Sequence, residues 1–202
     1  MRSVRRIGQL VGFCLGLVAP ALAQQGSGAP PARPAMPADT SIAGTVDREV
    51  SIYEFLVVGA AEAMPEDKFN FTPASLNVPG SAFKDVRTFG ALVKHTGAAN
   101  YVFWSGVTGE KLPANINGLN GPDDLTTKAQ IVQFLKDSFA LGHRAAKSLT
   151  PANVMEQVEF RNNKSSRLFM ATFAIVHCGD DYGQMVEYLR MNGIVPPASR
   201  GQ

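Results

Sequence analysis

Apolar residues recur at alternating steps of three and four along four segments of the chain, the spacing of one face of an α-helix. The segments cover about residues 45–64, 88–108, 127–149 and 165–193. Alternation of apolar and polar residues, which would indicate strands, is weak everywhere. The stripe of the first segment consists of Val46, Val50, Tyr53, Val57, Ala60 and Met64. The pattern therefore predicts an all-α protein.

Capping residues stand at the ends of these segments. Thr127 and Gln130 have the spacing of a capping box, in which each side chain satisfies a backbone N–H at the helix start. Ser165 or Ser166 can cap the fourth helix, and Gly193 can end it in a left-handed conformation. Four helices of about twenty residues predict a four-helix bundle, where sites are built from side chains on facing helices.

The N-terminus has the pattern of a secretory signal peptide at residues 1–23. Three arginines precede a short apolar stretch, and Ala21-Leu22-Ala23 matches the small-x-small motif that signal peptidase cuts. An uncleaved anchor is the alternative, although the apolar stretch is short for a membrane span. We expect cleavage, and therefore a secreted or periplasmic protein that is not attached to a membrane.

The rest of the chain divides by composition. Residues 24–41 are rich in Pro, Ala, Gly and Ser, which predicts a flexible linker. Residues 42–198 suit one helical domain with its own core, and residues 199–202 form a short tail.

Signal cleavage also changes the charge and the cysteine count. The net charge of +2 falls to about −1 when the three arginines are lost, which speaks against nucleic acid as a partner. Cys14 leaves with the signal, so Cys178 stands alone and no intramolecular disulfide is expected. Stability must come from the core.

Polar residues interrupt two of the apolar stripes. His95 lies on the stripe of the second helix, and His177 lies on that of the fourth, with Asp181 one turn later. The expected stripe of the fourth helix is Met170, Phe173, His177, Asp181, Gln184 and Tyr188. A buried carboxylate needs a cation or strong hydrogen bonds. Two imidazoles and a carboxylate suit Zn, Ni, Mn or Fe(II), and they leave coordination positions open for a substrate.

Simpler readings exist for each of these residues. A histidine on an apolar face is more often a hydrogen-bonded core residue, and Asp181 could face solvent at an end of the bundle. Asp180 is either an alternative ligand or a solvated residue, and His143 is expected at the surface or boundary. Cys178 points about 100° away from His177 around the helix and is expected to be a small buried side chain, not a nucleophile.

Three further residues are weaker candidates for substrate binding. Gln184 and Tyr188 follow Asp181 on the same helix and could hydrogen-bond a ligand, or could be purely structural. Asn100 lies on the second helix, one to two turns after His95, and joins them as a candidate beside an open coordination position.

Two stretches resemble a known family. VRTFGALVKHTGAANYVFWS, around His95, and HCGDDYGQMVEYLRMNGIVPP, from His177, are similar to the two signature segments of the DinB family (DinB/YfiT-like metalloenzymes). The resemblance covers about residues 45–198. It implies a four-helix bundle that binds a divalent metal through three histidines, whose positions here are His95, His177 and Asp181. The chain departs from the family pattern at Asp181, where the family has a histidine.

The resemblance also carries expectations about function. Family members of known activity are mostly transferases or isomerases that use a low-molecular-weight thiol, and many pair through their helices. It therefore implies a small-molecule substrate and a homodimer. We expect either a metal-dependent hydrolase or thiol-dependent transferase acting on a small electrophile, or a non-catalytic four-helix binding or dimerisation module whose metal site has decayed.

Overall fold

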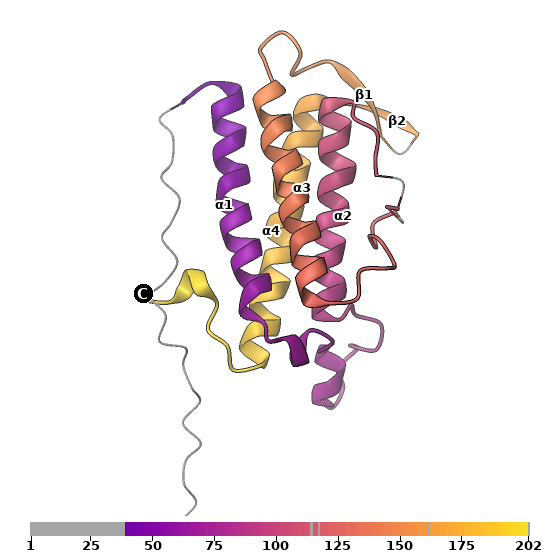
Figure 1. The fold of residues 1–202 in the computed structure, drawn as a ribbon, viewed down its shortest axis with the longest axis vertical. Coiled ribbons are helices and arrows are strands. Elements are labelled where there is room, and N and C mark those ends of the chain that lie inside the picture. Colours follow the sequence, from indigo (N-terminus) through magenta and orange to yellow (C-terminus); the bar gives the residue numbers. More distant parts are fainter. Residues whose placement is uncertain (1–38, 114, 117, 161, 202) are drawn as a thin grey trace, which may run out of the picture.

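Four long α-helices run side by side in the computed structural model, which describes residues 39–113, 115–116, 118–160 and 162–201 (Figure 1). Their bounds are α1 (Ile42–Ala63), α2 (Phe89–Thr108), α3 (Lys128–Ser148) and α4 (Arg167–Met191). The all-α four-helix prediction is confirmed. The expected signal peptide and most of the expected linker lie outside the described residues.

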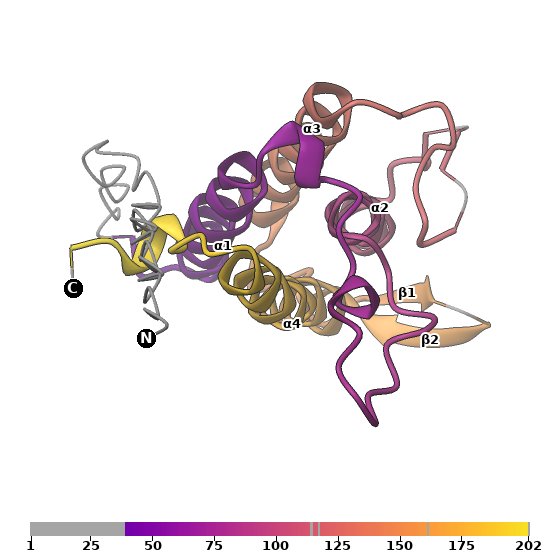
Figure 2. The same cartoon turned by 90° about the horizontal axis from the view of Figure 1, so that it is seen from below.

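The helices form a bundle in which α1 and α2 are diagonally opposite and each packs against α3 and α4 (Figure 2). The predicted stripe of α1 faces the core: Val50, Val57, Ala60 and Met64 are almost fully buried. The largest buried side chains, Trp104, Phe89, Phe103 and Phe139, come from α2 and α3. No helix in the described ranges has the length and hydropathy needed to cross a bilayer.

The helix ends follow the capping residues. The Thr127 side chain accepts from the backbone N–H of Gln130, whose own side chain accepts from the backbone of Thr127, so the predicted capping box is present. Ser166 caps α4 by accepting from the backbone of Phe169. Gly193 has φ of 72°, the left-handed conformation expected after the end of α4.

A β-hairpin before α4 departs from the sequence prediction. Strands β1 (Gln157–Phe160) and β2 (Asn163–Ser166) pair antiparallel, with Phe160 opposite Asn163. Asn162 adopts φ of 65°, which asparagine tolerates better than most residues and which two-residue hairpin turns favour. The alternation in Gln157-Val158-Glu159-Phe160, followed by an Asn in the turn, was the available signal. It is too short to stand out in a helical chain.

Three single-turn 3₁₀ helices, η1 (Glu66–Lys68), η2 (Pro73–Leu76) and η3 (Pro197–Ser199), complete the described elements. The connection between α2 and α3 lies along α2, where the Lys94 ammonium donates to the carbonyl of Pro122 at 2.9 Å. This connection and α4 bring the polar residues of the candidate site together.

Candidate metal centre

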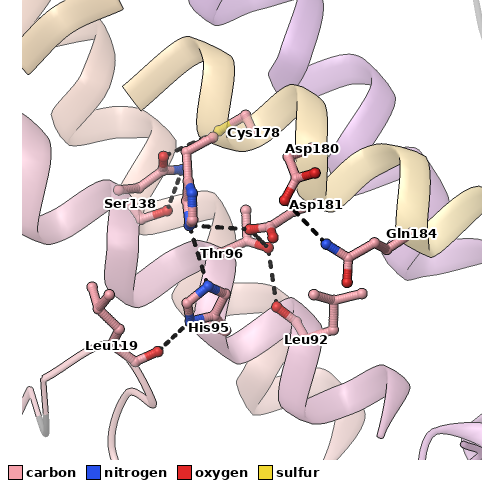
Figure 3. A network of polar contacts seen from close by, with 11 residues as sticks. Leu92, His95, Thr96, Leu119, Ser138, Cys178, Asp180, Asp181 and Gln184 are labelled. Carbon is pink, nitrogen blue, oxygen red and sulfur yellow. Dashed lines mark hydrogen bonds and ion pairs between the residues drawn. The ribbon is translucent and has the colours of Figure 1, made fainter. Parts of the chain in front are cut away.

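His95 is held in one orientation by the α2–α3 connection. Its Nδ1 lies 2.5 Å from the carbonyl oxygen of Leu119 (Figure 3). A carbonyl only accepts, so Nδ1 carries the hydrogen and Nε2 presents a lone pair when the ring is neutral. That Nε2 faces α4, 3.2 Å from Nε2 of His177. A histidine that ligates a metal is commonly fixed in this way by its second ring nitrogen.

Asp181 lies beside the two imidazoles with 2% of its surface exposed (Figure 3). One carboxylate oxygen accepts a hydrogen bond from the Thr96 hydroxyl at 2.8 Å and lies 3.6 Å from Nε2 of His177. Burial raises the pKa of this carboxyl, while His177, Thr96 and His95 act to lower it. The charged form therefore depends on a compensating positive charge at this position.

The three side chains form a cluster that could hold a divalent ion. One ligand atom from each lies within 4.8 Å of the other two. Two ligands about 2.05 Å from a tetrahedral zinc would be about 3.3 Å apart. Nε2 of His177 lies 3.2 Å from Nε2 of His95 and 3.6 Å from the Asp181 oxygen, and these two separations are close to that value. Nitrogen and carboxylate donors together suit Zn, Ni, Mn or Fe(II).

Aromatic rings surround the outer histidine. Phe103 meets His177 edge to face at 5.6 Å between ring centroids, and Phe173 stacks on it at 6.4 Å. His177 nevertheless keeps 21% of its side chain exposed, whereas Asp181 is buried. Solvent can thus reach the cluster from the His177 side.

The weaker candidates for substrate binding each have partners of their own. Asn100 is buried, where its amide donates to Ser138 and its oxygen accepts from the Cys178 thiol. Gln184 is exposed and donates to Asp180 at 3.1 Å. The Tyr188 hydroxyl donates to the backbone carbonyl of Arg87 at 2.9 Å. Of the three, Gln184 has the most solvent contact.

The simpler readings hold for three residues. Cys178 is buried, and burial raises the pKa of its thiol far above the usual range, which keeps it uncharged and unreactive. Asp180 is exposed. His143 lies at the α1–α3 boundary, with its ring nitrogens 2.6 Å from Asp47 and 3.0 Å from Glu54.

Two contacts of the cluster were missed by sequence reasoning. Thr96 is fully buried and holds the Asp181 carboxylate. The sequence feature that could have indicated this role is a hydroxyl directly after His95 in an otherwise apolar part of the helix. The Leu119 carbonyl had no such signal, because a backbone acceptor does not depend on the type of side chain.

The comparison with protein families agrees with this geometry. A family model of the DinB superfamily matches residues 56–185, a stretch that includes His95, His177 and Asp181. Among curated proteins, no relative matches the chain. Because the family model covers well over half of the sequence, the chain belongs to the DinB superfamily.

Proposed function

We propose that this chain is an exported, metal-dependent DinB enzyme in which His95, His177 and Asp181 hold a divalent ion. Its reaction is hydrolysis of a small electrophile, or transfer of a thiol to one. One observation carries the proposal. The Leu119 carbonyl fixes the His95 ring so that Nε2 faces the His177 nitrogen, with a buried carboxylate completing the cluster.

The number of protein groups that could bind the metal, three, supports a catalytic site over a purely structural one. Structural zinc sites usually have four protein ligands, whereas catalytic sites have three and keep a position open. A divalent ion supplies Lewis acidity, which polarises a substrate and favours the deprotonated form of a nucleophile. The chain's own residues orient that chemistry: Thr96 holds the carboxylate, and the exposed edge of His177 leaves a path for the substrate.

The proposed location bears on the choice of nucleophile. An exported protein meets little of the low-molecular-weight thiol that is abundant in the cytosol, so export favours water. The signal-peptide pattern supports export with cleavage after Ala23. N-terminal sequencing of the exported protein should find Gln24 first. An intact arginine-rich start would contradict cleavage.

A homodimer is also part of the proposal, on the basis of family resemblance. Sedimentation velocity of the purified protein should give about twice the mass of the mature chain. A single species at the monomer mass would contradict the homodimer and leave the proposed metal centre unaffected.

The reaction is tested by loading metal-free protein separately with Zn, Ni, Mn and Fe(II). Hydrolysis of p-nitrophenyl acetate is followed without thiol, and transfer to 1-chloro-2,4-dinitrobenzene with added cysteine. We expect turnover with at least one metal in wild type and in His143→Ala, and its loss in His177→Ala. His143 is the matched control because it lies outside the cluster. Full metal loading without turnover of either substrate would instead favour the non-catalytic binding module.

A further inference from the structure

Three apolar side chains of α4 are exposed beside the candidate metal centre. Phe169, Phe173 and Val176 have 43%, 36% and 64% of their surface exposed. They are spaced four and three residues apart, so they share one side of the helix with His177. We call these three side chains the α4 apolar stripe. Large apolar side chains that are exposed next to one another often mark a binding site.

The aromatic rings of the stripe are ordered against one another and against His177. Phe169 and Phe173 stack at 5.3 Å with an angle of 11° between ring planes, and Phe173 in turn stacks on His177 at 24°. The buried Phe103 supports the row from behind, because its ring meets Phe173 at 5.0 Å and His177 at 5.6 Å. The rings therefore form a continuous row that ends at a proposed metal ligand.

The length and ends of the row define what could lie on it. Phe169 and His177 are eight residues apart, roughly 12 Å along the helix axis. Beyond His177 the same side of α4 becomes polar, where Gln184 donates to Asp180. A molecule with one aromatic ring and a short polar end matches this order, with the ring on the stripe and the polar end at the cluster.

The area of the stripe is small for a protein interface. Two partly exposed phenylalanines and a valine offer on the order of 250 Å². Each partner in a standard protein–protein interface contributes about 800 Å². The stripe is thus large enough for one ring of a small molecule and too small, by itself, for a stable contact between chains.

We propose that the α4 apolar stripe is the substrate subsite of the metal centre and binds the aromatic portion of the small electrophile. The proposal rests on the proposed function, since it assigns the substrate class of the same site. Phe173 is the main determinant of specificity, because it lies between Phe169 and His177 and contacts both.

The first test does not depend on metal. Benzyl alcohol at millimolar concentration is titrated into isotope-labelled, EDTA-treated protein while backbone amide signals are recorded by NMR. Saturable shifts are expected between Phe169 and His177, with affinity reduced roughly five- to tenfold in Phe173→Ser and in Phe169→Ser. Val78→Ser is the matched control, since Val78 is 48% exposed and belongs to the segment between η2 and α2, which lies at the end of the bundle opposite the β-hairpin (Figure 1). It should bind as wild type does.

Two results, one from this titration and one from sedimentation velocity of the same variants, would overturn the proposal. One is the absence of saturable shifts on α4, or an equal response in all variants with native helix content by circular dichroism. The other is a dimer that Phe173→Ser converts to a monomer, because the stripe would then be covered by a second copy.

A second test links the stripe to the cluster. Benzohydroxamate and acetohydroxamate both chelate divalent metals, and they differ in the aromatic ring. In zinc-loaded wild type, benzohydroxamate should bind about tenfold more tightly, and Phe173→Ser should remove that preference. Equal binding of the two in wild type contradicts the subsite alone. If neither hydroxamate binds but benzyl alcohol gives the expected shifts, the metal centre is contradicted and an aromatic binding site on α4 remains.

Discussion

Thr96 is the residue that holds the buried Asp181 carboxylate by a side-chain hydrogen bond. Its hydroxyl lies 2.8 Å from Asp181 and 3.0 Å from the carbonyl of Leu92, inside the bundle (Figure 3). Because the carboxylate is buried, a neighbour that donates a hydrogen bond both orients it and favours its charged form.

Replacing Thr96 by Val keeps the shape and removes the donor, so zinc affinity should fall roughly 10- to 100-fold. Thr96→Ser should restore most of it. Competition with a chromogenic chelator measures the change. Ser138→Ala is the control, since Ser138 is another buried hydroxyl of the same network and touches no proposed ligand. Unchanged affinity in Thr96→Val would remove the assigned role.

The position of His143 between two carboxylates of α1 leads to a second prediction, about the dependence of stability on pH. The hydrogen bond to Glu54 raises its pKa, and Asp47 acts in the same direction, against the opposing effect of burial. A raised pKa in the folded state means that protonated His143 stabilises the protein. This contribution is complete below the unfolded pKa of about 6.5 and is lost as the pH rises through the folded value.

Urea unfolding of wild type and His143→Gln between pH 5.5 and 8.5 tests this sign. The stability advantage of wild type should be largest at the acid end and shrink as the pH rises. Arg144→Gln, on the same helix and mostly exposed, should show no such trend. An advantage that grows with pH would contradict the assignment.

The three side chains of the cluster could be predicted from the sequence, but the contacts that hold them in place could not. His95 and His177 stand out because polar residues on apolar helical stripes need partners, and Asp181 stands out because a buried carboxylate needs them most. The position of the Leu119 carbonyl depends on where the described part of the α2–α3 connection contacts α2, and no periodic pattern in the sequence predicts that contact.

Among the elements, the α2–α3 connection matters most for the site. Gly121 has φ of 75°, and a Cβ there would lie 2.8 Å from the Lys94 side chain and 3.3 Å from its carbonyl oxygen. Glycine therefore allows the connection to lie close to α2. This close approach brings the Leu119 carbonyl to His95.

Gly121→Ala should move the connection away from α2 and weaken zinc binding by roughly tenfold through His95. Gly80→Ala is a matched control: it has φ of 79° and no neighbouring atom within 4 Å of the added Cβ. Both changes should cost about 1 kcal/mol of stability from the left-handed backbone, and Gly121→Ala should cost more. Equal zinc affinity in the two variants would show that the connection does not orient His95.

Two predictions about the elements were wrong: the residues that form the inner face of α4, and the absence of strands before it. The expected stripe of α4 placed Phe173 and Gln184 with the core, but both are exposed. Ala171, Ala174, Cys178 and Met185 face inward instead. These residues make up the inner face of α4, and Phe173 lies outside it with 36% of its surface exposed. The hairpin before α4 was missed because its strands are only four residues long.

At the scale of the whole molecule, the bundle brings two helices and one connection to a common point. His95 comes from α2. His177 and Asp181 come from α4, which packs against both α1 and α2 (Figure 2). Cys178 is the free cysteine of the described residues and is buried, so the bundle depends on its apolar core and not on a disulfide there. A bound ion would add stability by binding only the folded state.

The central claim is that His95, His177 and Asp181 hold a divalent ion, and the metal content of purified protein tests it most directly. The protein is produced in metal-replete medium, and wild type, His177→Ala, Asp181→Ala and His143→Ala are measured by inductively coupled plasma mass spectrometry. We predict about one ion per chain in wild type and His143→Ala, with marked loss in the other two. Wild type without stoichiometric metal, or equal metal in all four proteins, would contradict the account.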